Sequence, residues 1–308
     1  MLDTSRSTAC HRVAHGWTVV MTVAAMLAMA ALAEAHDFWL VPNAFENRSG
    51  GQLEIRGQTS SRFPTSESAV TIDRVADARF LGASTVERIV DLSISGKSLR
   101  LRHRPATPGQ QVIAVRLHPR SVRESAAGFR RYLELEGAPD ALARVDREGL
   151  LRGRDSVTRR YAKYAKAIVE VGRDGPRAFS RTADHPLEFV PEQDPATLAV
   201  GDTLRARLLY RGQALAGIRI HADAVEWRGS RTTTQPRPTP AGARAANPQP
   251  AEHHITDAEG NVRVAITRPG LWNIRTIHLV QSDSGSGADW DTHWATLVFH
   301  ASGRGSRR

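Results

Sequence analysis

Histidine is the residue type in this sequence with the clearest capacity for chemistry, and His36 is the most informative one. It follows Ala33 and Ala35, which are spaced like the small residues at the −3 and −1 positions of a signal-peptidase cleavage site. Cleavage after Ala35 makes His36 the first residue of the mature chain. An N-terminal histidine offers one metal ion both a free amine and an imidazole. These are nitrogen donors, which Cu(II) and Ni(II) favour.

A single residue does not complete a metal site, so the fold must bring further imidazoles to the ion. His278 lies on a predicted strand, His293 lies near the start of the last strand, and His185 lies just before another. Each has a plainer interpretation as a residue on the face of a sheet, and His253-His254 is typical of a solvated loop pair. The predicted metal ligands are His36, His278, His293 and His185.

The segment before His36 is typical of a secretory signal. Residues 1–16 carry Arg6 and Arg12, and residues 17–32 are almost continuously apolar. An uncleaved anchor is the alternative, although a spanning helix needs about 20 apolar residues. We therefore expect a signal peptide at 1–35, a periplasmic or secreted protein, and no transmembrane segment after cleavage. The only cysteine, Cys10, leaves with the signal, so neither a disulfide framework nor a thiolate site is expected.

Composition and motifs exclude several functions. The net charge is +10, but the arginines are scattered and no aromatic-basic module is present, so nucleic acid is not an expected partner. Neither G-x-S-x-G nor H-E-x-x-H occurs, which argues against a serine hydrolase and the commonest zinc peptidases. We expect a protein that is not an enzyme. A copper oxidative enzyme with His36 as ligand is a minor alternative.

The periodicity predicts a mainly β fold with a helical insertion, organised as two β-sandwich (Ig-like or prealbumin-like) domains. Short alternating runs such as 89–94, 98–102 and 111–117 predict an N-terminal β domain over 36–120. A helical segment follows over 121–185, with predicted helices at 124–135, 139–151 and 155–167.

The remaining chain returns to the pattern of strands separated by turns. Strands are predicted at 187–191, 203–210, 215–222, 262–266, 271–275 and 294–299. Together they predict a C-terminal β-sandwich over 186–300. The Pro/Thr/Arg-rich stretch within 229–252 is predicted to be a mobile insertion, and 301–308 a disordered tail.

Several short motifs occur in an order that resembles a known family. They are His36-Asp37-Phe38-Trp39-Leu40 after the signal, Tyr161-Ala162-Lys163-Tyr164-Ala165-Lys166, Leu187-Glu188-Phe189-Val190-Pro191, Leu209-Tyr210-Arg211-Gly212-Gln213 with Leu215-Ala216-Gly217, Thr256-Asp257 with Gly260, and Gly270-Leu271-Trp272. This order resembles the DUF4198 family of exported bacterial proteins, some of which are linked to nickel and cobalt uptake. The C-terminal half also resembles the prealbumin-like sandwiches found beside carboxypeptidases.

The resemblance implies a metal-linked role in the envelope, and the histidines agree with it. We expect an exported protein that binds nickel, cobalt or copper through His36. It would serve a membrane metal transporter or an outer-membrane receptor system. The alternative is a non-catalytic sandwich that binds an envelope glycan or a partner protein.

Overall fold

The computed structural model describes residues 36–136, 138–172, 174–227 and 252–303. Residues Met1–His36 and Asp37–Arg308 form two compact units, and all the helices and strands given below belong to the second. The predicted signal (1–35), nearly all of the predicted insertion (229–251) and residues 304–308 of the predicted tail lie outside the described residues.

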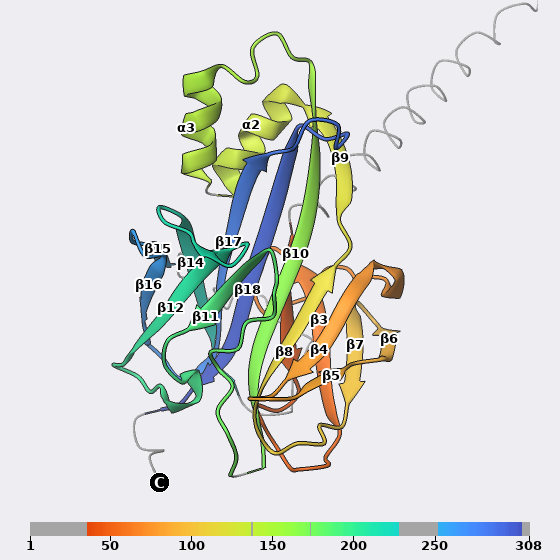
Figure 1. The fold of residues 1–308 in the computed structure, drawn as a ribbon, viewed down its shortest axis with the longest axis vertical. Coiled ribbons are helices and arrows are strands. Elements are labelled where there is room, and N and C mark those ends of the chain that lie inside the picture. Colours follow the sequence, from red (N-terminus) through yellow and green to blue (C-terminus); the bar gives the residue numbers. More distant parts are fainter. Residues whose placement is uncertain (1–35, 137, 173, 228–251, 304–308) are drawn as a thin grey trace, which may run out of the picture. The chain divides into compact units, whose positions relative to one another are not determined.

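A long central sheet, sheet B, organises the second unit (Figure 1). Its strands run in the order β15-β14-β17-β18-β10-β8-β4-β5, with β2 and β9 paired to β10. Their bounds are β2 (Glu46–Asn47), β4 (Val75–Leu81), β5 (Val86–Arg88), β8 (Gly109–Leu117), β9 (Arg120–Ser125), β10 (Ser156–Val171), β14 (Arg219–Val225), β15 (Glu252–Ile255), β17 (Gly270–Gln281) and β18 (Trp290–Ala301).

Sheet A covers part of one face of sheet B. It consists of β1 (Asp37–Pro42), β3 (Leu53–Ser60), β7 (Ser98–His103) and β6 (Asp91–Ser95), with the 3-10 turn η1 (Ile72–Arg74) nearby. Phe38 and Trp39 are each 1% exposed and pack in the core between these sheets. These two side chains therefore hold β1 in the core.

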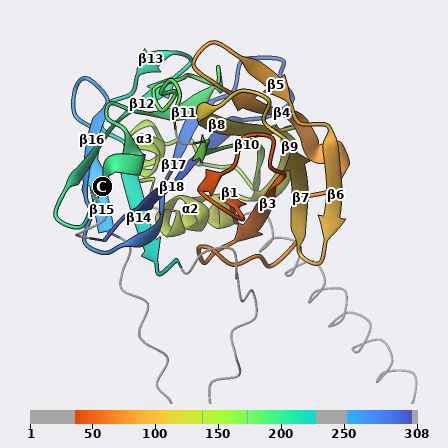
Figure 2. The same cartoon turned by 90° about the horizontal axis from the view of Figure 1, so that it is seen from below.

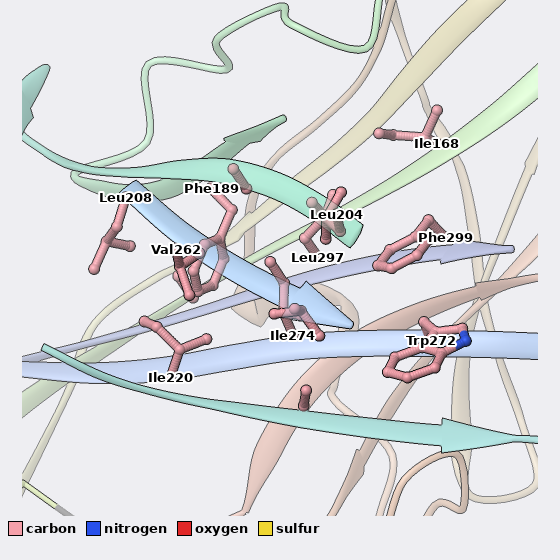
Figure 3. Close-up of a cluster of buried hydrophobic side chains, with 14 of the residues drawn as sticks. Ile168, Phe189, Leu204, Leu208, Ile220, Val262, Trp272, Ile274, Leu297 and Phe299 are labelled. Atoms are coloured by element: carbon pink, nitrogen blue, oxygen red, sulfur yellow. The ribbon is translucent and has the colours of Figure 1, made fainter. Parts of the chain in front are cut away.

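Sheet C covers the opposite face of sheet B. It consists of β11 (Leu187–Pro191), β12 (Thr203–Tyr210), β13 (Gln213–Ala214) and β16 (Asn261–Ala265), with the 3-10 turn η2 (Pro195–Thr197) beside it. Alternate residues of β12 point into the core, as expected for period-2 side chains. Figure 3 shows this core, in which Phe189 and Leu204 of sheet C face Ile274 and Leu297 of sheet B.

Two helices complete the covering of the sheet A side. α2 (Ala126–Leu135) begins after Ser125, whose hydroxyl accepts a hydrogen bond from the Gly128 amide at 3.0 Å. α3 (Pro139–Glu148) ends at Gly149, which has a left-handed φ of 63°. Both helices pack on the ends of β10, β17 and β18 (Figures 1 and 2), through a core that includes Trp290 and Trp294.

The predicted helix over 155–167 is wrong, because these residues belong to the long strand β10. Its residues 159–167 pair in parallel with 290–298 of β18. β10 is covered on both faces, since Tyr164 lies in the core with sheet C and Ala165 in the core with sheet A. A strand buried on both faces loses the polar-apolar alternation that identifies a strand in sequence.

The fold is mainly β with a helical segment, and it contains two sandwich packings that share sheet B. Sheet B draws strands from both predicted β domains, so the boundaries proposed near residues 120 and 185 fall between strands of a shared sheet. Ala301, placed in the tail by the sequence, ends β18. In the described part of the chain, no helix has the length and apolar character needed to cross a membrane.

Candidate functional site: a His–Tyr cluster

Two of the predicted metal ligands, His278 and His293, lie directly opposite each other in sheet B. They are Cα partners in the antiparallel hairpin of β17 and β18. Side chains of directly opposed residues point to the same face, with Cβ atoms about 4.5–5.5 Å apart. Both imidazoles lie on the face that sheet C covers, because their neighbours Ile274 and Leu297 point into that core.

Two tyrosines join these histidines to a third predicted ligand. The Tyr210 ring centroid, at the end of β12, lies 4.8 Å from that of His278 and 5.3 Å from that of His293. Tyr164 of β10 stacks on His293 at 5.9 Å, and its hydroxyl lies 3.0 Å from His293 Nδ1. The His185 ring lies 5.5 Å from the Tyr164 ring. We call these five residues the His–Tyr cluster.

Burial keeps the imidazoles of the His–Tyr cluster neutral. It lowers the pKa of His293 to about 4, with a further contribution from His278. Burial also lowers the pKa of His278. The pKa of His185 falls well below its usual value through burial and the nearby positive charge of Lys166. A neutral imidazole keeps a nitrogen lone pair, which a metal ion requires.

Several of these ring nitrogens are buried and have no hydrogen-bond partner. They are Nδ1 of His278, Nε2 of His293 and both ring nitrogens of His185. Most buried polar atoms in proteins have a partner, so each exception calls for an explanation. If His293 donates from Nδ1 to the Tyr164 hydroxyl, its Nε2 lone pair is available, which is the usual arrangement of a metal-bound histidine. Neutral imidazole nitrogens with a lone pair are donors that transition metals accept.

The carboxylate beside the cluster is already engaged. Arg160 donates to both oxygens of Asp291, at 2.6 and 2.9 Å. In the described ranges, no group of three or more His, Cys, Asp or Glu side chains is arranged to hold a metal ion. An ion between His278 and His293 would therefore take further donors from a tyrosine hydroxyl or from outside the protein.

The opposite face of sheet B has a different character near β1. Asp37 is 4% exposed and pairs with Arg275 at 3.0 Å, and Arg275 also pairs with Asp223 at 3.2 Å. Burial lowers the pKa of Lys163 to about 8, and burial together with Asp37 raises the pKa of Glu136 to about 8. We call these five residues the charged cluster.

The structure thus brings together His185, His278 and His293, three of the four predicted ligands. Asp37, which the sequence places directly after His36, lies on the other face of sheet B. His36 itself ends the N-terminal unit, and its participation in a metal site stays a prediction. A small pocket lies elsewhere. It is lined in part by Phe45, Glu46, Glu170 and His300, and it contains none of the predicted ligands.

The sequence analysis missed a second pair of imidazoles, His221 and His253, which are Cα partners on β14 and β15. His253 was interpreted as a residue of a solvated loop. The sequence predicted only the first of the two strands, at 215–222, and β15 begins where the predicted insertion ends, so no local pattern indicated the pair. The tyrosines at 164 and 210 gave no signal either, since their positions depend on contacts between strands distant in sequence.

Several solved structures show weak likenesses to the chain. The adhesin InvE of Yersinia pseudotuberculosis is 13% identical with a TM-score of 0.20, covering 87% of this chain and 59% of the adhesin. A putative membrane-anchored protein from Corynebacterium diphtheriae is 10% identical with a TM-score of 0.21, over 87% and 59%. The α2-macroglobulin of E. coli is 10% identical with a TM-score of 0.24, over 86% and 16%. At these scores none supports an argument.

The sequence comparisons are more decisive. No curated protein matches the chain significantly. The model of a family described as a domain of unknown function (DUF4198) matches residues 33–280, which include β1, the His–Tyr cluster as far as His278, and most of sheets B and C. The resemblance inferred from the short motifs is thereby confirmed, and the chain belongs to the DUF4198 family.

Proposed function

We propose that this protein is an exported, non-enzymatic metal-binding protein of the bacterial envelope that holds a transition metal ion between His278 and His293. One observation supports this most directly. The two histidines are directly opposed Cα partners in one hairpin, and each has a buried ring nitrogen without a hydrogen-bond partner.

The donor atoms favour a particular class of metal. Neutral imidazoles suit nickel, cobalt, copper and zinc, whereas calcium and magnesium prefer oxygen ligands. The Tyr210 ring contacts both imidazole rings. His185 lies behind Tyr164, so we assign it to the surroundings of the ion rather than to its ligands.

The N-terminal chelate belongs to the same proposal as a separate set of donors. Cleavage after Ala35 would give His36 a free amine beside its imidazole. Such a chelate at the start of the chain suits capture of an ion and its transfer to a membrane transporter or receptor system. The role proposed is binding and delivery.

Calorimetric titration with Ni(II), Co(II), Cu(II) and Zn(II) tests the first donor set. We expect the His278→Ala/His293→Ala double variant to bind one ion fewer than wild type. The matched control is His118→Ala, because His118 is an exposed histidine outside the His–Tyr cluster. Equal stoichiometry in the double variant and the control would refute binding at His278 and His293.

Comparison of the mature chain with a form that carries one extra residue before His36 tests the N-terminal chelate. Mass spectrometry first establishes whether the mature chain begins with His36. One extra residue before His36 keeps the imidazole but removes the chelating amine, so we expect weaker binding of one ion. Unchanged affinity would refute the chelate and leave the His278–His293 site unaffected.

One observation favours a different function, recognition of an envelope glycan or a partner protein. Tyr210 is half-buried, Arg211 lies 5.2 Å over its ring, and Arg160 and Asp291 lie on the same side of sheet B. Aromatic faces beside charged hydrogen-bonding groups are a common feature of binding surfaces. Retention of envelope glycan by metal-stripped wild-type protein, and its loss in Tyr210→Ala, would favour this alternative.

A further inference from the structure

The hairpin of β14 and β15 carries another pair of histidines at the edge of sheet B. His221 and His253 are directly opposed, and their ring centroids lie 4.6 Å apart with an angle of 87° between the ring planes. His221 is 8% exposed, whereas His253 is exposed on the edge strand. One ring is therefore fixed by packing, and the other is accessible to an ion from solution.

The separation of the two rings fits a shared metal ion. A metal–imidazole nitrogen bond is about 2.1 Å, which puts the ion about 3.2 Å from each ring centroid. Two imidazoles bound at a right angle then have centroids about 4.6 Å apart, and a tetrahedral angle gives about 5.3 Å. The observed distance equals that of the right-angled arrangement, which tetragonal Cu(II) and Ni(II) sites adopt, and it also lies in the range of ordinary T-shaped ring contacts.

The chemistry around His221 also suits a ligand. Its Nε2 is buried without a hydrogen-bond partner, while the ring bonds to the backbone of Glu136. In metal-bound histidines, a hydrogen bond from the ring nitrogen that does not bind the metal orients the ring in this way. Burial lowers the pKa of His221 to about 3, with contributions from Arg275 and His253, so the ring is neutral.

The positive charge of Arg275 does not rule out a cation here. Arg275 lies opposite His221 in the neighbouring strand, but its guanidinium is paired with Asp37 and Asp223. An arriving ion therefore meets a nearly neutral group of charges rather than an isolated arginine. The exposed edge strand leaves room for water to fill the remaining coordination positions.

We propose that His221 and His253 form a second transition-metal site, selective for Cu(II) or Ni(II), which is open to solvent and exchanges its ion readily. It is separate from the His278–His293 site and lies on a different hairpin. With two protein ligands and open positions, it suits temporary binding and transfer better than permanent storage.

The test uses the full chain with His36→Ala, His278→Ala and His293→Ala already in place, so that binding by the other proposed donors is removed. Cu(II) and Ni(II) are titrated by calorimetry, and the Cu(II) form is measured by electron paramagnetic resonance. We expect one remaining ion, bound through two imidazole nitrogens. Adding His253→Ala should weaken its affinity at least tenfold. His253 is exposed, so this change should leave the fold intact, which thermal unfolding checks.

The matched control is His254→Ala, on the same edge strand. Adjacent strand residues point to opposite faces, so His254 does not face His221. We expect His254→Ala to change the affinity by less than threefold. Equal effects of His253→Ala and His254→Ala, or no ion bound in the background variant, would overturn the proposal. Failure of the His278–His293 site would appear separately, as unchanged stoichiometry when only those two residues are replaced.

Discussion

Two clusters of buried polar groups, which lie on opposite faces of sheet B, behave in opposite ways. On the face covered by sheet C, the His–Tyr cluster is neutral, and several of its ring nitrogens have no partner. On the other face, the charged cluster holds Asp37, Arg275 and Asp223 in a chain of ion pairs at 3.0 and 3.2 Å. Both sets are largely removed from water.

This contrast separates a candidate binding site from a structural network. Charges that are buried beside opposite charges offset each other's loss of hydration, and replacing one exposes the rest to that cost. Neutral nitrogens without partners lose their hydrogen bonds to water without any replacement inside the protein. A ligand would restore what they lack. We therefore expect substitutions in the ionic groups to change stability, and substitutions in the His–Tyr cluster to change binding.

The largest loss of stability should come from a buried ion pair on the sheet C face that belongs to neither cluster. Lys166 and Glu188 are 1% and 4% exposed, and their charged atoms lie 2.8 Å apart. Glu188→Ala leaves a buried, unpaired ammonium, and we expect it to lower the free energy of unfolding by about 3–5 kcal/mol. Chemical denaturation measures this.

The control for this change is Glu192→Ala, whose partner Arg207 is 47% exposed. An exposed pair contributes about 1 kcal/mol or less. If the two variants lost equal stability, the distinction between buried and exposed ion pairs in this protein would be wrong.

The charged cluster predicts an unusual dependence of stability on pH. Burial, followed by Asp37, raises the folded-state pKa of Glu136 from 4.5 to about 8. Between pH 4.5 and pH 8 the folded protein keeps Glu136 protonated, whereas the unfolded chain does not. The contribution of Glu136 to the free energy of unfolding is therefore complete below pH 4.5 and is lost as the pH rises towards 8. The slope is at most about 1.4 kcal/mol per pH unit.

Lys163 has the reverse effect at higher pH. Burial lowers its folded-state pKa from 10.5 to about 8. The contribution of Lys163 to the free energy of unfolding is complete above pH 10.5 and is lost as the pH falls through 8. The two groups together predict lowest stability near pH 8. Glu136→Gln should remove the decline below pH 8, measured as the difference from wild type in denaturant unfolding, whereas the exposed control Glu134→Gln should not.

The sequence predicted much of the fold but little of either cluster. Strands such as β12 were predicted because only one of their faces is buried, so apolar residues recur at every second position. β10 was mistaken for a helix because both of its faces are buried. The sequence could have predicted that His278 and His293 lie opposite each other. The Ser-Gly-Ser-Gly stretch at 284–287 lies midway between them, and a turn there pairs the two positions in a hairpin. The contacts of Tyr164 depend on parallel pairing with a strand about 130 residues away, which no local pattern indicates.

The hydrogen bond between Tyr164 and His293 gives a sharper test of the neutral cluster. Tyr164→Phe keeps the ring but removes the hydroxyl that lies 3.0 Å from His293 Nδ1. Loss of a hydrogen-bond partner of a metal-bound histidine typically weakens binding about 10- to 100-fold. We expect this loss of Ni(II) or Cu(II) affinity in calorimetry. Tyr161→Phe is the control, because Tyr161 lies on the same strand with its side chain on the opposite face, and an equal effect would contradict the assignment.

The smallest loss of stability should come from the N-terminal cap of α2, one of the two helices on the side of sheet B that carries the charged cluster. Ser125 caps α2 by accepting a hydrogen bond from the Gly128 amide, so Ser125→Ala should lower the free energy of unfolding by about 1 kcal/mol. Ser121→Ala, at an exposed position on the same strand β9, should change it by less than about 0.5 kcal/mol.

The same variant also tests whether the two faces are independent. α2 ends next to Glu136, and its core contacts include Trp290 and Trp294 on the face away from the His–Tyr cluster. Loosening this helix should therefore increase amide hydrogen exchange in α2 and at the adjoining ends of β17 and β18, while metal affinity at His278 and His293 stays within twofold of wild type. A matched loss of metal affinity in Ser125→Ala would show that the helices also hold the hairpin in position. The charged cluster and the His–Tyr cluster would then act as one coupled unit rather than independently.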